Sequence, residues 1–221
     1  MKIMTLIAVL FIGTFAYSQK VENQKSSMSL GPQTSYYVTV QGADVNLLED
    51  AWKDYVKEFG KSKNNKKAKE YVTDMAKVAL INGTSPLTIY AQHNEGKGEA
   101  TTRIWVDLGG AFANPEDHKA QSDGIETFMY DFWIVARKKA ISKELAVEEK
   151  RLESFNKDLK KLEDKNKGYH NDIEKAKQKI IEAENNIEIN IVDQDNKKLE
   201  IQNQQKSVQM VVDKLNSVGK N

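Results

Sequence analysis

The sequence predicts an α+β protein, built as a small antiparallel sheet with two helices on one face and followed by a long helical coiled coil. Two observations predict this class. Short aromatic and β-branched runs alternate with helical apolar stripes between residues 34 and 140, in the order βαβββα or close to it. Apolar residues then recur every seven positions over residues 141–219, among charged and amide side chains. We therefore expect an α+β head over 34–140 and a coiled coil over 141–219.

The first residues, MKIMTLIAVLFIGTFAYSQ, predict a signal peptide over residues 1–18, cleaved between Ser18 and Gln19. A positive start at Lys2 precedes an apolar stretch that ends in small residues. A membrane anchor is the alternative, but a spanning helix needs roughly 20 apolar residues and this stretch is shorter. We therefore expect export to the periplasm or cell envelope, with no membrane span after cleavage.

Composition narrows the classes of function. The chain has 33 basic and 32 acidic residues, so no global field draws it to nucleic acid. It has no cysteine, which excludes disulfides, thiolate nucleophiles and Cys-ligated metal sites. Residues 19–33 are polar and contain serine, glycine and proline, which predicts a flexible leader.

Four strands and two helices are expected in the head. The strands are the β-branched and aromatic runs at 36–40, 70–79, 87–93 and 100–108. The first helix, 44–59, repeats apolar residues at three- and four-residue steps, and Gly60 suits its C-terminal end. The second helix begins at Asn114 and Pro115, a favoured cap and a favoured first helical residue, and is apolar over 125–136.

Two segments invite an anion-binding interpretation. Residues 61–69 contain five lysines, but no aromatic residues interleave them, so a solvated connection is favoured over a polyanion-binding loop. Gly109 and Gly110 lie between a strand and a helix, where many proteins hold phosphate. Their spacing fits no phosphate-binding motif, and Glu116 and Asp117 already occupy the first turn of the helix. We interpret the glycine pair as a bend.

The strand 100–108 predicts a candidate binding surface. Ile104, Val106 and Leu108 share one face, and alternation places Arg103, Trp105 and Asp107 on the other. An antiparallel sheet covered on one side leaves its second face open. This second face, or the lysine-rich loop, could engage a peptide, glycan or polyanion, which makes a periplasmic binding module the alternative function.

The tail carries the strongest pattern. Counting Leu145 as heptad position a, the apolar a and d positions form a predicted coiled-coil core. A lone amphipathic helix would drift off a seven-residue repeat, because 3.6 residues per turn is not 3.5. The core residues are Leu145, Leu152, Phe155, Leu159, Leu162, Ile173, Ile180, Ile187, Ile201, Val208, Val211 and Leu215.

This seam needs a partner helix, and the sequence leaves its source open. The favoured interpretation is an antiparallel hairpin within the chain, turning near Gly168 or over 190–197, where three successive core positions are polar. The unbroken register favours the alternative of a long helix that does not turn, paired with a second copy or another protein. Asn166 in the core could fix the register or mark the approach to a turn.

Little catalytic chemistry is visible. His93, His118 and His170 share no metal-ligand spacing, and no nucleophile motif occurs. Asp107 with His118 is the one cluster that could be tested as a hydrolase. We predict no catalytic residue, no cofactor and no metal ligand.

The start ending in Tyr17-Ser18-Gln19, the stretch AWKDYVK at 51–57, WVDLGGAF at 105–112 and the charged heptad tail resemble a group of exported Bacteroidota proteins of unassigned function. The resemblance covers nearly the whole mature chain. It implies export and the two-part layout, and it carries over no catalytic or binding residue. The expected function is that of a non-enzymatic exported structural or interaction protein, whose coiled coil serves assembly or spacing.

Overall fold

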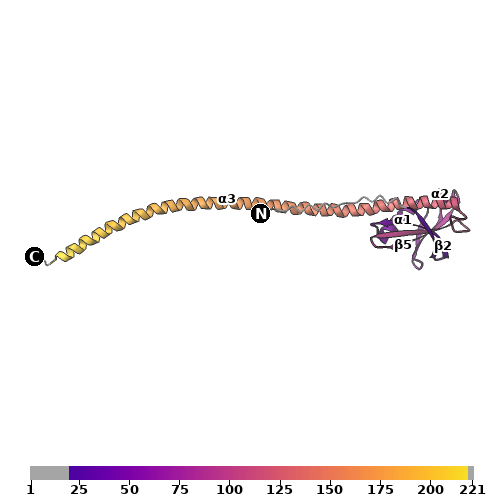
Figure 1. Ribbon diagram of the computed structural model, residues 1–221, viewed down its shortest axis with the longest axis horizontal. Helices are drawn as coiled ribbons and strands as arrows, with labels where there is room; N and C mark the ends of the chain where they lie inside the picture. The colour runs from indigo at the N-terminus through magenta and orange to yellow at the C-terminus, as the bar shows by residue number, and fades with distance from the viewer. Residues whose placement is uncertain (1–19, 219–221) are drawn as a thin grey trace. The chain divides into compact units, whose positions relative to one another are not determined.

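The computed structural model describes residues 20–218, which form one six-stranded antiparallel sheet and three helices (Figure 1). The strand order in the sheet is β1-β2-β6-β5-β4-β3. The α+β class and the long C-terminal helix are confirmed, whereas the predicted signal peptide lies outside the described residues. The elements are β1 (Glu22–Met28), β2 (Gly31–Gln41), α1 (Val45–Val56), β3 (Ser62–Asn65), β4 (Glu70–Ala76), α2 (Ala79–Asn82), β5 (Leu87–Glu95), β6 (Glu99–Asp107) and α3 (Lys119–Ser217).

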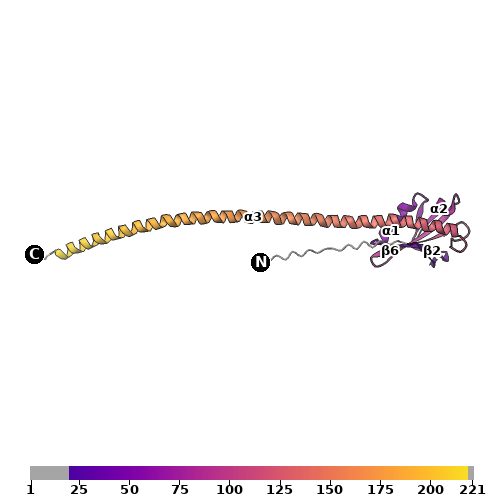
Figure 2. The ribbon, with the colours of Figure 1, turned by 45° about the horizontal axis from the view of Figure 1, so that its top comes forward.

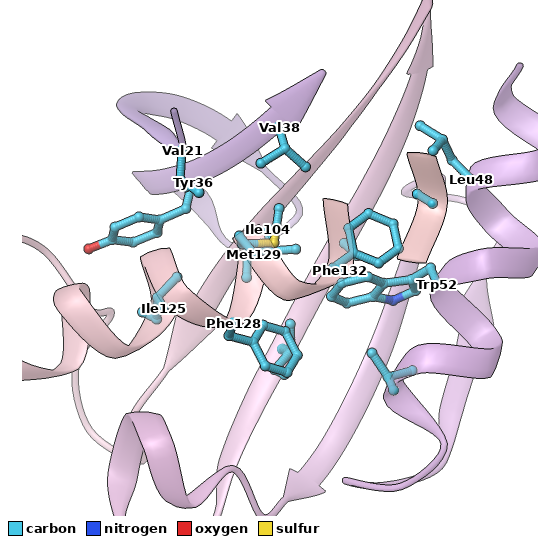
Figure 3. Packing of buried hydrophobic residues seen from close by; sticks show 14 of the residues in the cluster. Val21, Tyr36, Val38, Leu48, Trp52, Ile104, Ile125, Phe128, Met129 and Phe132 are labelled. Carbon is cyan, nitrogen blue, oxygen red and sulfur yellow. The ribbon is translucent and has the colours of Figure 1, made fainter. Parts of the chain in front are cut away.

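The described part of the chain divides into two units, with the boundary between Lys150 and Arg151. In the first unit, α1 and the first turns of α3 lie on the same face of the sheet (Figure 2), as the sequence predicts. Trp52 of α1 and Phe132 of α3 meet edge to face, with ring centroids 5.1 Å apart (Figure 3). Strand residues such as Tyr36 and Ile104 form the floor of this core and are fully buried.

Local signals set the bounds of the first helix and the approach of the last one. The Asp44 side chain accepts a hydrogen bond from the Leu47 amide at 2.8 Å and so caps α1. Gly124 lets α3 pack against α2, because a Cβ at this position would lie only 2.2 Å from the Leu80 carbonyl oxygen. Any side chain at residue 124 would therefore push the two helices apart.

The glycine pair forms a bend. Gly109 has φ +97°, a left-handed conformation that favours glycine. The chain reverses across it, with the Leu108 amide donating to the Ala111 carbonyl and the Ala113 amide donating to the Val106 carbonyl. The helix starts later than predicted. Asn114 caps an isolated turn by accepting from the Asp117 amide at 2.8 Å, and α3 itself begins at Lys119.

The prediction of a flexible leader is wrong for its described part. Residues 22–28 form β1, which pairs antiparallel with β2 from Glu22 opposite Tyr37 to Met28 opposite Gly31. The strand is polar because it lies at the sheet edge, where backbone pairing suffices and only one side chain, Met28, needs burial. Polar composition alone therefore does not show that this segment is a strand.

The expected solvated connection at 61–69 is also more ordered than predicted. Ser62–Asn65 forms β3, an edge strand that pairs with β4 through a tight turn. Charged side chains on an edge strand discourage pairing with another sheet. The lysine run therefore has a structural role that composition did not reveal.

The predicted hairpin in the tail is wrong, because α3 is a single helix through both suspected turns (Figure 1). Gly168 costs a helix only about 1 kcal/mol relative to alanine, which is too little to end a helix this long. The polar stretch at 190–197 is held in helix by local side-chain contacts, including Gln194 to Asn190 at 2.6 Å and Lys197 to Glu200 at 2.6 Å. None of the helices within residues 20–218 combines the length and apolar character needed to cross a bilayer.

Candidate functional site

The most extensive candidate site is the heptad seam, which we define as the twelve predicted core residues from Leu145 to Leu215. Every one of them is more than half exposed, from 51% for Ile173 to 72% for Leu215. Isolated apolar residues on a surface are common, but an apolar stripe that recurs at heptad spacing over this length, interrupted by polar core positions at 166 and over 190–197, marks an interaction site. Among residues 20–218, no segment covers the seam.

Polar contacts along the tail do not stabilise the helix as much as packing of the seam against another helix would. Ion pairs such as Lys157–Glu153 at 2.6 Å and Lys177–Glu174 at 2.8 Å join residues three or four apart on the same helix. Each such pair contributes about 0.3–0.5 kcal/mol. Helices in proteins draw most of their stability from packing an apolar face, so these pairs are a minor term.

The expected open face of the sheet is closed at two of its three candidate residues, so that prediction is wrong there. Trp105 is fully buried, and its indole nitrogen donates to the Ser26 carbonyl at 3.3 Å. Arg103 donates to the Ser35 hydroxyl at 2.7 Å and stacks over the Tyr37 ring. Both contacts involve the β1–β2 hairpin, which covers this face.

Asp107, the third candidate, accepts a hydrogen bond from the Gly109 amide at 2.9 Å and supports the bend. The His118 Nδ1 atom lies 3.4 Å from the Asn114 amide nitrogen, so the hydrogen bonds of His118 and Asp107 involve different neighbours. The structure therefore gives no support to the hydrolase hypothesis. Within residues 20–218, no cluster of three or more His, Cys, Asp or Glu residues is placed to hold a metal ion.

A buried carboxylate holds the β1–β2 hairpin over the sheet. Glu70 of β4 is fully buried and accepts from the Ser29 amide at 2.8 Å and the Ser29 hydroxyl at 2.6 Å. Gln92 of β5 donates to the same carboxylate at 3.3 Å. A buried charge needs such hydrogen bonds to be tolerated. Sequence reasoning missed this contact because its partners lie 41 residues apart.

A cavity of about 310 Å³ lies in the head, between α1 and the β3–β4 hairpin. We call it the lysine cavity, because two of its wall residues, Lys66 and Lys69, come from the lysine run. Lys69 has φ +54°, a strained conformation for a residue with a side chain. The remaining lining residues are Val45, Glu49, Asn64, Tyr71 and His93.

His93 lines this cavity and has a buried ring nitrogen without a partner in the described part of the chain. Its Nδ1 lies 2.9 Å from the Thr102 hydroxyl, whereas its buried Nε2 has no hydrogen-bond partner among the described residues. Burial, aided by the charge of Lys53, lowers the pKa of His93 to about 4. The ring is therefore neutral near pH 7. Opposite it, the Tyr71 hydroxyl donates to Glu49 at 2.6 Å.

Comparison of the chain with protein-family models, with curated proteins and with solved structures finds no match. The seam and the lysine cavity therefore carry the functional argument through their own geometry.

Proposed function

We propose that the protein is a non-enzymatic structural or interaction protein, exported to the periplasm or cell envelope, whose tail pairs with another helix through the heptad seam. The exposure of all twelve seam residues is the observation that carries this proposal. Full burial of a leucine or isoleucine contributes about 1.5–3 kcal/mol. The summed contribution of the seam residues would therefore exceed the entropic cost of association.

A second copy of the chain is the partner that we propose. Residues 141–218 contain 15 basic and 16 acidic residues, so two tails would meet without a large net repulsion. Homo-oligomers with closed symmetry are the commonest assemblies of soluble proteins. The pairing would make the tail a device for assembly or spacing.

The test replaces two neighbouring seam residues by charge, Ile180→Asp with Ile187→Asp. We expect the mass from light scattering to fall to that of one chain and the helicity to drop, because buried unpaired charges are strongly destabilising. The control Gln178→Asp with Asn185→Asp adds the same charges on the opposite side of the helix. A wild-type protein that is already a single chain at micromolar concentration, or a double seam variant with unchanged mass, would refute self-association.

A second candidate function is that of a binding module centred on the lysine cavity. The two lysines of the cavity wall favour it, because ammonium groups that share one cavity attract an anion. Lys66 and Lys69 take part in no ion pair among residues 20–218, so the ligand would be a small anion.

Calorimetric titration with inorganic phosphate tests this candidate. We expect binding to be lost in Lys66→Ala with Lys69→Ala, and to persist in Lys97→Ala, a control in the turn between β5 and β6. Equal heats for the wild type and the double variant would remove the cavity as a binding site.

A further inference from the structure

The charged residues at core positions of the tail distinguish the two directions in which a second copy could lie. Two of these positions carry charge, Glu148 and Lys197, both at position d. In a parallel, in-register pair each residue faces its own copy. Lys197 would then face the partner's Lys197 and Glu148 the partner's Glu148, and both contacts repel within a seam shielded from water.

From these positions we infer that the two tails pack antiparallel and fully overlapped, with a twofold axis between Ile181 and Glu182. The inference rests on the proposed function, because it assigns a direction and a register to the same seam. In an antiparallel pair, each a position faces a d position of the partner. The arrangement that places Leu145 opposite the partner's Val218 keeps all 22 a and d positions in contact.

This arrangement removes both like-charge contacts, and it places Glu148 opposite the partner's Leu215, next to the end of the seam. Lys197 faces the partner's Asn166, whose side-chain oxygen can accept a hydrogen bond from the ammonium group. A shift by one heptad in either direction would instead place Lys197 against an apolar residue, Leu159 or Ile173. The pair Asn166–Lys197 thus favours one register, as polar core residues do in other coiled coils.

Side-chain sizes favour the same arrangement. Ile180 and Ile187 face the partner's Ala183 and Ala176, and Phe155 faces the partner's Val208. Large residues meet smaller ones, which keeps the distance between the helices even and the seam filled. In the parallel alternative, phenylalanine would face phenylalanine and alanine would face alanine. The helices would then be forced apart at the phenylalanines and leave unfilled space at the alanines.

Charges flanking the seam do not decide the direction. The antiparallel pair brings together three attractive combinations, Lys165 with Glu200, Glu163 with Lys198 and Lys177 with Glu184, and two repulsive ones, Arg151 with Lys214 and Asp172 with Asp193. The parallel pair likewise gives three attractive and two repulsive combinations at these flanking positions. The core positions therefore carry the inference.

Disulfide cross-linking tests it, because the chain has no cysteine of its own and each introduced thiol is unambiguous. Leu152 faces the partner's Val211 in the inferred register. We expect mild oxidation of co-expressed Leu152→Cys and Val211→Cys chains, carrying different tags, to yield the covalent heterodimer. Each variant alone should remain a non-covalent dimer. Cross-linking of Leu152→Cys to itself in the dimer would overturn the antiparallel direction.

The register has its own control in the same experiment. Leu152→Cys co-expressed with Gln204→Cys should not cross-link, since these residues meet only after a shift of one heptad. Efficient cross-linking of that pair would overturn the full overlap. If light scattering shows a single chain for the wild type, the proposed self-association itself fails, and that result is distinct from either outcome above.

A second measurement leaves the seam untouched. Lys150 lies on the side of the helix away from the seam, so a spin label on Lys150→Cys should not disturb packing. In the inferred arrangement the two labels are about 95 Å apart, because 63 residues separate 150 from the position it faces at 1.5 Å per residue. Pulsed spin resonance should then find no short distance, and a short distance would overturn the inference.

Discussion

Helix α3 carries two apolar stripes of similar regularity, of which one is buried against the sheet and the other is exposed. Its first turns bury Ile125, Phe128 and Phe132 against the sheet (Figure 3). Farther along, the heptad seam leaves residues such as Leu159 more than half exposed. An apolar stripe therefore predicts burial but does not predict whether the covering partner belongs to the same chain or to another.

The two stripes also occupy different positions of the repeat. Counted in the register of Leu145, the residues that pack on the sheet fall at positions b, c, e and f. The short packed stretch can follow the natural 3.6-residue period, whereas the tail keeps a seven-residue repeat that only a supercoil satisfies over many turns. Packing on the sheet therefore leaves the a and d positions from Ile141 onward free for another helix.

Matched truncations give the largest expected effect. Phe132→Ala should lower the free energy of unfolding of the head by about 3–5 kcal/mol, since it empties a filled core site. The loss should not depend on protein concentration. Leu159→Ala should leave the head transition unchanged and lower only a concentration-dependent melting of the tail. Urea unfolding followed by tryptophan fluorescence measures the first effect, and helicity at several concentrations measures the second. A tail transition that does not depend on concentration would contradict pairing of the tail with a second chain.

The regular elements of the head could be predicted because their patterns are local. The first helix and the strands at 87–93 and 100–108 were placed within a few residues, since apolar periodicity and turn residues mark them. Strand β1 could not be, because its polar residues are ordered by backbone pairing and by a contact between Ser29 and Glu70. The sequence around each of these two residues gives no signal that predicts this contact.

The candidate sites show the same division. The helix that carries the seam could be predicted, because a heptad repeat is visible without a structure, whereas the pairing of the seam residues with another helix stays a prediction. The predicted fold-back of the tail was wrong, since Gly168 weakens a helix without ending it. The lysine run was noted, but its proximity to His93 depends on the β3–β4 hairpin, a non-local arrangement.

The second prediction compares the loss of a buried carboxyl group in the head with the loss of an exposed one in the tail. Glu70→Ala should lower the free energy of unfolding by about 1–3 kcal/mol, because it leaves the Ser29 amide and hydroxyl without their acceptor. Hydrogen exchange should show lost protection in β1. The control Glu174→Ala removes an exposed ion pair with Lys177 and should change stability by less than about 0.5 kcal/mol. Retained protection of β1 in Glu70→Ala would show that strand pairing alone holds the hairpin.

The third effect compares two histidines, one in each region. The pKa of His93 is lowered to about 4 by burial, whereas an unfolded histidine titrates near 6.5. Between these values the unfolded chain binds a proton that the folded head does not, so the free energy of unfolding should fall as the pH falls from about 6.5 to 4. The loss should be roughly 1–3 kcal/mol, and it should be complete near pH 4.

Replacement of the buried histidine and of the exposed histidine should change the pH dependence of stability differently. His93→Gln should flatten the dependence between pH 6.5 and 4, while His170→Gln on the exposed tail should leave it intact. Asp44 does not confuse the window, because its hydrogen bonds to Lys143 and the Leu47 amide lower the pKa of its carboxyl, and its stabilisation is lost mainly below the usual aspartate value. A slope that survives unchanged in His93→Gln would contradict the prediction, because other groups would then bind the protons between pH 6.5 and 4.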